Sequence, residues 1–468
     1  MSWIEYKGFD HGAFEFAGWV WGLIIVYFAS PLIFYIVLPA ITNRFHSRLK
    51  IKKNQIVICV LGDLGHSPRM CYHAESFAKL GYQVKLCGYV ESLLPLDILN
   101  DEEIDIYQIK VIKNYFHLPY ILFGLLKVLY QSITLTSLLF NVMENSNYIL
   151  IQNPPSLPIL LIIVILKKFW FKNCKIIIDW HNLNYTILNL KFQNLQHPIV
   201  KFMKFYESFL SKYSYLNLVV SKKMGIFLNK EFGINKAKII TLYDKAANHF
   251  KPVSSQDEKL KIIAKFPQIF EVSNNFFEFE ANKDKIIISS TSFSEDEDFS
   301  VLIQALMLYD EEINKSLPNL LVIITGKGPL KEKFLNQVKK ADFTKIIVKT
   351  IWVSSEDYPT ILSVADLGVS LHKSSSGVDL PMKIVDLFGC GIPVISLTFD
   401  SIEELVKDGV NGILVKDFIG MFNALEILLN ENNGPESLEK IKKGAMLESQ
   451  ERWDETWNTT FGSLFRLD

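Results

Sequence analysis

The stretch SSSGVDLPMKIVDLFGCGIPVI, from Ser374 to Ile395, contains a polar loop, a short helix, a glycine break and a strand in succession. A helix that returns to a strand through a tight glycine turn is the repeating unit of α/β domains. The helix is apolar except for Lys383 and Asp386, which are three residues apart and so share one helix face. A cation in the first turn opposes the helix dipole, so its position indicates that an anion lies beside it.

The alternation of strands and helices continues on both sides of this stretch, which predicts two Rossmann-like domains whose facing sheet edges form a cleft. The N-terminal domain is predicted at 54–250 and the C-terminal domain at 286–440. Residues 251–285 are expected to form an irregular linker and surface insertion, and 441–468 a helical end. The predicted strands cover 55–61, 82–89, 105–112, 148–152, 175–180, 216–221, 238–244, 285–291, 320–326, 345–352, 365–372, 393–397 and 412–415.

The N-terminal part carries a long uncharged segment, residues 16–42, which exceeds the roughly 20 apolar residues needed to cross a bilayer. We expect a transmembrane helix there, with a core helix as the alternative. Lysines and arginines concentrate in the basic flank, 43–53, whereas Lys7 is the only one before the segment. The positive-inside rule therefore places residues 1–15 in the lumen and the rest of the chain in the cytosol.

Two further apolar runs, 118–140 and 157–170, could be core-facing crossover helices or could insert shallowly into the same membrane. The near-neutral net charge of -1 argues against nucleic-acid binding. The five cysteines are scattered and contain no C-x-x-C pair, which is typical of reduced thiols in a cytosol-facing protein.

Three turns at strand ends are predicted to present backbone N–H groups to a diphosphate, although each could be an ordinary turn. The first contains Gly62 and Gly65, and the second contains Lys327 and Gly328. The third comprises Ser374, Ser375, Ser376 and Gly377 and leads to Lys383. Asp386 is expected to accept hydrogen bonds from the hydroxyls of a ribose. Together these residues form a predicted nucleotide-binding site.

The acidic run at 295–298 contains a D-x-D pattern. It can mark a helix start, a site of contact with a second substrate or of base chemistry, or a metal site, and a helix start is the favoured interpretation. No metal ligand is assigned. The candidates for the catalytic base are, in order, His181, Asp63 and Glu295.

In the motifs described above and in several further stretches, the chain resembles the chitobiosyldiphosphodolichol β-mannosyltransferase family of GT-B glycosyltransferases. The resemblance rests on GDLGHSPRMCYHA, QNPPSLPIL, IDWHNLNYTIL, LYDKAA, SSTSFSEDEDFS, ITGKGPLKEK, EDYPTIL, DLGVSLHKSSSGVDLPMKIVDLFGCGIPVI and ERWDETW. It implies GDP-mannose as donor, dolichyl diphosphate chitobiose as acceptor, a β-1,4-mannosyl product formed with inversion, and a place on the cytosolic face of the endoplasmic reticulum.

The pattern departs from that of retaining GT-B enzymes. Asp386 stands where those enzymes hold the ribose with a glutamate, and their upstream acid falls near Val378 or Asp379, so it is absent or displaced. Their arginine and lysine after the first strand of the second domain are also missing, which suits an inverting subgroup.

Two other functions remain open from the sequence: a non-catalytic scaffold subunit of a membrane mannosyltransferase complex, and a nucleotide-sugar epimerase on the same fold. For the transferase, no cofactor is expected to be required, and stimulation by a divalent cation is left open. Later mannosyltransferases of the pathway are expected as partners.

Overall fold

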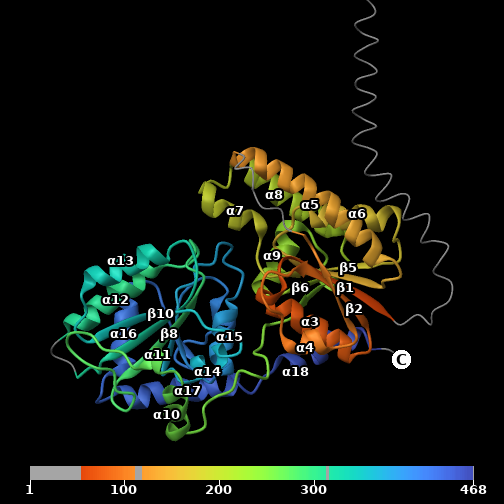
Figure 1. Cartoon of the computed structure of the whole chain (residues 1–468). Coiled ribbons are helices and arrows are strands. Elements are labelled where there is room, and N and C mark those ends of the chain that lie inside the picture. Colours follow the sequence, from red (N-terminus) through yellow and green to blue (C-terminus); the bar gives the residue numbers. More distant parts are fainter. Residues whose placement is uncertain (1–53, 111–118, 313–315, 467–468) are drawn as a thin grey trace, which may run out of the picture.

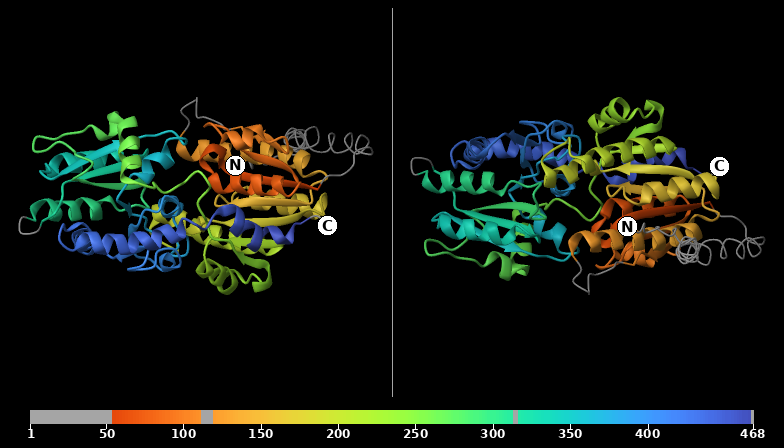
Figure 2. Two further views of the ribbon diagram at one scale, coloured as in Figure 1. Left: turned by 90° about the horizontal axis from the view of Figure 1, so that it is seen from below. Right: turned by 90° about the horizontal axis from the view of Figure 1, so that it is seen from above.

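The computed structural model describes residues 54–110, 119–312 and 316–466. Two α/β domains lie side by side, each built on one parallel sheet, which confirms the predicted pair of domains (Figures 1 and 2). The predicted transmembrane helix, 16–42, and basic flank, 43–53, lie outside the described residues. Within the described residues, no helix combines the length and the apolar character needed to cross a membrane.

The first sheet has the order β3-β2-β1-β4-β5-β6-β7 and the second has the order β10-β9-β8-β11-β12-β13. Each predicted strand is present because runs of isoleucine, valine and leucine suit buried parallel strands. The strands are β1 Gln55–Asp63, β2 Gln83–Tyr89, β3 Ile104–Gln108, β4 Tyr148–Asn153, β5 Lys175–Trp180, β6 Leu216–Val219, β7 Ile239–Thr241, β8 Lys285–Thr291, β9 Leu320–Gly326, β10 Ile346–Ile351, β11 Leu367–Ser370, β12 Val394–Leu397 and β13 Gly412–Val415.

Helices cover both faces of the first sheet (Figure 1). One face packs against α5, α6, α8 and α9, and the other against α3, α4 and the C-terminal helix α18, Trp453–Thr460. The helices of this domain are α3 Pro68–Lys79, α4 Leu96–Asn100, α5 Tyr120–Met143, α6 Ile159–Phe169, α7 Asn184–Phe192, α8 Pro198–Leu210 and α9 Lys222–Phe232. Helices α5 and α6 bury one face in the core, as crossover helices do.

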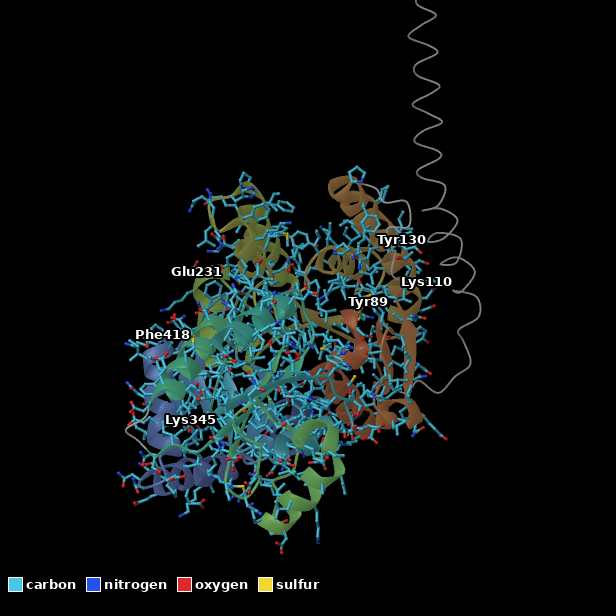
Figure 3. The ribbon with its side chains drawn as sticks, turned by 60° about the vertical axis from the view of Figure 1, so that its left-hand side comes forward. Tyr89, Lys110, Tyr130, Glu231, Lys345 and Phe418 are labelled. Carbon is cyan, nitrogen blue, oxygen red and sulfur yellow. The ribbon has the colours of Figure 1, made fainter. Side chains whose placement is uncertain are left out.

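The second sheet is covered in the same way by helices from its own domain and from the segment before it. Figure 3 shows the side chains of both domains, with Lys345 and Phe418 on the second and Tyr89, Lys110 and Tyr130 on the first. The helices are α10 Gln256–Lys265, α11 Pro267–Phe270, α12 Phe299–Glu311, α13 Lys331–Ala341, α14 Tyr358–Ser363, α15 Met382–Gly389, α16 Phe418–Leu429 and α17 Gly434–Glu448, followed by α18 Trp453–Thr460.

The segment 251–285 differs from the irregular linker that we expected, because it contains α10 and α11. The side chain of Ser255 accepts a hydrogen bond from the Glu258 N–H, which satisfies a free donor at the start of α10. Ile269 and Phe270 are buried in the core of the second domain. The segment is therefore part of that domain's packing.

Candidate active site

The carboxyl ends of the two sheets face each other, so loops from both domains meet at one place. The ring centroids of His66, beyond β1, and Trp352, beyond β10, are 6.5 Å apart. Asn182, beyond β5, donates to Asp379 Oδ2 at 3.1 Å and to Ser375 Oγ at 3.3 Å. This is the edge at which open α/β sheets bind ligands.

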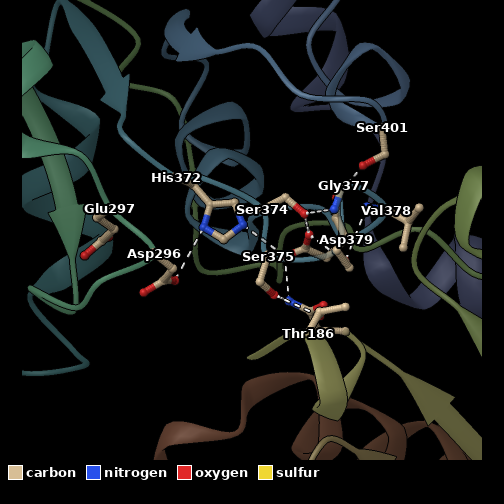
Figure 4. A network of polar contacts seen from close by, with 12 residues as sticks. Thr186, Asp296, Glu297, His372, Ser374, Ser375, Gly377, Val378, Asp379 and Ser401 are labelled. Atoms are coloured by element: carbon tan, nitrogen blue, oxygen red, sulfur yellow. Dashed lines mark hydrogen bonds and ion pairs between the residues drawn. The ribbon is translucent and has the colours of Figure 1, made fainter. Parts of the chain in front are cut away.

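His372 holds two acidic loops of the second domain together (Figure 4). Its Nε2 lies 2.9 Å from Asp379 Oδ2 and its Nδ1 lies 3.6 Å from Asp296 Oδ2. Burial alone would lower the pKa of His372, but the two carboxylates raise it to about 9. The imidazole is therefore charged at neutral pH and fixes both loops.

The turn from Ser374 to Gly377 lies at the cleft with its hydroxyl groups bonded to protein. Ser374 Oγ donates to Asp379 and accepts from the Gly377 N–H at 2.7 Å. Ser376 Oγ contacts Asp379 at 3.4 Å, and Ser375 Oγ lies 3.1 Å from Thr186 Oγ1 of the first domain (Figure 4). A phosphate bound at this turn would have to replace some of these partners.

The anion beside Lys383 in this structure is a carboxylate of the chain. Lys383 Nζ lies 2.6 Å from Glu297 Oε1, and Glu297 also accepts from the Ser292 N–H at 3.1 Å. Lys383 thus joins the start of α15 to the loop that follows β8. The pairing explains a cation in the first turn of the helix without requiring a ligand there.

Asp386 lies one turn further along α15 and has a different partner. Its Oδ2 is 3.4 Å from the Tyr358 hydroxyl, which itself donates to Ser290 Oγ at 2.8 Å. Burial raises the pKa of Asp386 to about 7, since few groups replace the water around its charge. The group can therefore gain or lose a proton near neutral pH.

The four acids at 295–298 have four different surroundings. Asp298 is the N-cap of α12 and accepts from the Ser300 N–H at 3.2 Å, which confirms the helix start. Asp296 faces His372, Glu297 pairs with Lys383, and Glu295 is exposed. Among the described residues, no group of three or more His, Cys, Asp or Glu side chains is placed to hold a metal ion.

The glycines of the second predicted turn allow two loops to touch. A Cβ at Gly328 would lie 1.8 Å from the Ser292 carbonyl oxygen, so any other residue would force the loops apart. Lys327, between the glycines, places its Nζ 3.9 Å from the centroid of the Trp352 ring. The cation is therefore held over an indole at the mouth of the cleft.

Only one of the two glycines of the first turn is required by packing. A Cβ at Gly65 would lie 2.3 Å from Ser92 Oγ and 2.6 Å from the Leu93 carbonyl oxygen, whereas at Gly62 the nearest atom would be 3.4 Å away. The structure thus places Gly65 against the loop after β2. Gly62 has more room around it.

His181 follows β5 and is held by a buried carboxylate. Its Nε2 lies 3.0 Å from Asp179 Oδ2, and Arg69 and His73 bind the same carboxylate at 2.8 Å and 3.2 Å. Burial opposes ionisation of Asp179, but the Arg69 charge together with His181 and His73 outweighs it and holds the pKa well below its usual range. The carboxylate can therefore orient His181 and stabilise the charge of a protonated imidazole.

Asp63 is ionised, and its oxygens already have partners. It accepts from the Glu91 N–H at 2.9 Å, from the Ser92 hydroxyl and from His66, whose Nδ1 lies 2.7 Å away. Burial opposes ionisation, but these hydrogen bonds lower the pKa of Asp63 to about 2. Such a group is a weak base at neutral pH.

Sequence reasoning missed the cross-domain contacts of Asn182, Thr186 and Asp379. It also missed His372, which joins two loops of the second domain, and Arg69, which holds Asp179. His372 lies two residues before the predicted third turn, and Asp379 lies near the position of the upstream acid of retaining enzymes. Arg69 bonds to Asp179 and, at 2.7 Å, to Asp244 of the interdomain segment.

A cavity of about 350 Å³ also lies between the domains, lined by Lys222, Tyr243, Asp244, Lys245, Leu380, Val385, Glu404, Leu405, Lys407, Glu448, Glu451 and Thr456. It contains none of the candidate site residues, so the site is defined by the loop contacts above.

The chain is similar over nearly its whole length to proteins named chitobiosyldiphosphodolichol beta-mannosyltransferase. The Debaryomyces hansenii protein is 50% identical, with 99% of this chain and 98% of the relative covered. The Mus musculus protein is 36% identical, with 87% of this chain and 88% of the relative covered. A family profile described as "Glycosyl transferases group 1" matches residues 272–446.

Solved structures of glycosyltransferases share the fold at low sequence identity. Sucrose-phosphate synthase from Thermosynechococcus elongatus has a TM-score of 0.65 and 14% identity, covering 88% of this chain and 98% of its own. Anabaena HepE, solved in complex with UDP and glucose, has a TM-score of 0.62 and 13% identity, covering 88% and 99%. These likenesses show a GT-B-like fold.

Proposed function

Because this chain belongs to the chitobiosyldiphosphodolichol β-mannosyltransferase family, we propose that it transfers mannose from GDP-mannose to dolichyl diphosphate chitobiose. The product is a β-1,4-mannosyl linkage formed with inversion at the anomeric carbon. The observation that carries this proposal is the 50% identity over almost the full length of both chains. The cleft between two parallel sheets supplies a place for the reaction.

The donor binds to the second domain. The diphosphate takes the place of the Glu297 carboxylate beside Lys383, whose Nζ already lies at an anion site. The ribose hydroxyls donate to Asp386, and the guanine lies near residues 350–357, where Trp352 is 53% exposed. Lys327, held over the Trp352 ring, adds a second positive charge near the diphosphate.

The reaction is a single displacement. The acceptor hydroxyl oxygen bonds to the anomeric carbon as the bond from that carbon to the phosphate oxygen breaks, and GDP leaves with the electron pair. His181 takes the hydroxyl proton, and Asp179 stabilises the imidazolium. Fixed cations stabilise the leaving diphosphate. No cofactor is required, and stimulation by a divalent cation remains to be measured.

The enzyme works at the endoplasmic reticulum membrane. Residues 16–42 anchor it as a single span, and the two domains face the cytosol, where the lipid-borne acceptor is presented. Later mannosyltransferases of the pathway are proposed partners, because they would use the product of this reaction. The uncharged segment and the basic residues after it support this placement.

Incubation of the purified full chain with labelled GDP-mannose and phytanyl diphosphate chitobiose tests the proposal. We expect label on the lipid acceptor, and none when UDP-glucose replaces the donor. A scaffold subunit would transfer nothing from either donor. An epimerase would change the labelled sugar of GDP-mannose in the absence of acceptor, and either result would overturn the proposal.

A further inference from the structure

Helix α8 presents an apolar stripe on its outer face. Ile199, Phe202, Phe205 and Phe209 are 50%, 55%, 62% and 46% exposed, and their spacing places them on one side of the helix. The opposite side of α8 is buried in the core of the first domain through Val200, Met203, Tyr206 and Leu210. Core packing therefore does not explain these three phenylalanines.

The stripe extends across the two neighbouring helices. Helix α6 packs against both α5 and α8, in the layer above the first sheet (Figure 1). Each neighbour also exposes large apolar side chains: Leu161, Ile165 and Phe169 on α6, with Trp170 just beyond it, and Leu126, Leu129 and Ile133 on α5. These residues and the α8 stripe are called the apolar face below. A patch of this kind marks a binding surface.

Lysines predominate around the apolar face, where the exposed acid Glu231 pairs with Lys204 of α8 at 2.9 Å. Between Glu144 and Glu231 the sequence contains eleven lysines and only two acids, Asp179 and Glu207. Both acids are fully buried, so they add no negative charge to the surface. Lys168, Lys172, Lys201 and Lys212 are exposed close to the apolar face in sequence. The full chain has a net charge of -1, so this surface is far more basic than the molecule as a whole.

We propose that the apolar face docks on the surface of an anionic lipid bilayer, with the phenylalanines of α8 inserted among the headgroups and acyl chains. Exposed aromatic and aliphatic residues, flanked by many more exposed lysines than exposed acids, are the features of a helix that lies in a membrane interface. The inference rests on the proposed function, whose acceptor is carried by a lipid. It adds a second membrane contact, separate from residues 16–42.

Docking at the apolar face would also affect the cleft between the domains, because α8 holds the start of α7 in place. Glu207, on the buried side of α8, accepts from the Asn184 N–H at 2.9 Å and the Tyr185 N–H at 3.1 Å at the start of α7. Thr186 of α7 then contacts Ser375 in the second domain. One short series of contacts therefore connects the apolar face with the predicted donor turn.

A single-position fluorescence measurement tests the proposal on the full chain. All five cysteines are buried, so a cysteine introduced by Phe205→Cys can be labelled selectively with the fluorophore NBD. The labelled chain is reconstituted into phosphatidylcholine vesicles with or without phosphatidylserine. Leu99→Cys, on α4 across the first sheet and 49% exposed, is the matched control. Both variants are also assayed for mannose transfer to a detergent-dispersed acceptor.

We expect NBD at position 205 to shift to the blue and to be quenched by nitroxide-labelled lipids, more strongly with phosphatidylserine, while position 99 stays in water. Equal, water-like signals at both positions would overturn the docking proposal. A blue shift that appears only when another protein is added would also overturn it, in favour of a protein partner. If the chain transfers mannose in detergent but position 205 does not contact lipid, only the docking proposal is contradicted. If position 205 contacts lipid but no mannose is transferred, the proposed function is contradicted.

A double variant gives a second readout. Phe202→Ser with Phe205→Ser should reduce transfer to acceptor in anionic vesicles by about tenfold, since two inserted aromatic side chains are lost. Transfer to detergent-dispersed acceptor should stay within about twofold, because neither residue is part of the cleft. Unchanged transfer in vesicles would contradict the proposal.

Discussion

Lys383 is the single residue on which diphosphate binding should depend most, because its ammonium group is already held at an anion site. A charge-assisted contact contributes about 1.5–3 kcal/mol, so Lys383→Ala should weaken GDP binding by about ten- to a hundredfold. Calorimetry on the purified variant measures this. Lys373→Ala is the control, since that lysine is exposed and pairs with Asp298. If both variants bind GDP like the unmodified chain, the nucleotide binds elsewhere.

Asp386 should make donor binding depend on pH. Ribose hydroxyls donate to the ionised carboxylate, and burial raises the pKa of that carboxyl group to about 7 in the empty site. Binding therefore releases a proton below that pH, and affinity should fall by up to about tenfold for each pH unit below 7.

GDP-mannose is the ligand to use for this measurement. Its terminal phosphate is esterified to mannose, so it lacks the ionisation by which the terminal phosphate of GDP titrates in the same range. Asp386→Asn cannot ionise and should give a weaker but flat profile between pH 5.5 and 8. A sloping profile in that variant would assign the pH dependence to another group.

His181 should be needed for turnover and not for donor binding. As the proposed base it contacts the acceptor hydroxyl, so His181→Ala should lower turnover by about 10² to 10⁴-fold and leave GDP affinity unchanged. His66→Ala is the control, because that ring lies beside Trp352 at the same cleft. Retention of more than about a tenth of turnover by His181→Ala would leave Asp63 and Glu295 as candidates, and the three partners of Asp63 then favour testing Glu295 first.

For single residues, the sequence predicts which positions belong to the site better than it predicts which groups their side chains contact. Lys383 and Asp386 could be predicted from their spacing on one short helix. The partner of Lys383 could not, because Glu297 is 86 residues away and reaches it through a loop. The same holds for His372, whose two carboxylates come from separate loops.

At the scale of elements, the start of α7 depends on one buried carboxylate of α8. Glu207 accepts from two N–H groups of α7 and from the Asn153 amide at 2.9 Å. Glutamine can accept at only one of its two atoms, so Glu207→Gln should leave a donor unsatisfied and cost about 1–3 kcal/mol locally. Hydrogen exchange at Asn184 and Tyr185 should become at least about fivefold faster.

Ser208→Ala is the matched control for this measurement, because its hydroxyl bonds only to the Phe205 carbonyl within α8. Exchange at the start of α7 should not change in that variant. Equal exchange in Glu207→Gln and the unmodified chain would show that α7 does not rely on this cap.

Strands were the elements that sequence reasoning predicted best. Runs such as KIIIDW and LLVIITG place consecutive apolar residues on both faces of the sheet, so their positions could be predicted closely. Helices α10 and α11 were missed because the segment 251–285 is largely polar and its periodicity is weak. The Ser255–Glu258 capping pair was the signal that could have identified α10.

At the scale of the whole molecule, the C-terminal end lies against the first domain although it follows the second domain in sequence (Figure 2). Trp457 of α18 is fully buried and donates to His73 Nδ1 at 2.9 Å, and Trp453 donates to Ser76 Oγ at 3.0 Å. The sequence predicted a helical end but not its location, because contacts with α3 span the length of the chain.

Trp457→Ala should therefore destabilise the first domain, although the residue follows the second in sequence. The loss of a buried tryptophan costs about 3–5 kcal/mol, which chemical denaturation followed by far-UV circular dichroism would measure. Leu464→Ala is the control, since Leu464 is 56% exposed. A change no larger than that of the control would mean that α18 contributes little to folding.

The configuration of the newly formed glycosidic bond tests the proposed function most directly. The full chain is incubated with labelled GDP-mannose and phytanyl diphosphate chitobiose, and the lipid product is digested with β-mannosidase or with α-mannosidase. We predict that β-mannosidase alone releases the label and that Lys383→Ala forms little product. Label released by α-mannosidase, or no labelled lipid from a folded chain that binds GDP, would contradict an inverting β-mannosyltransferase.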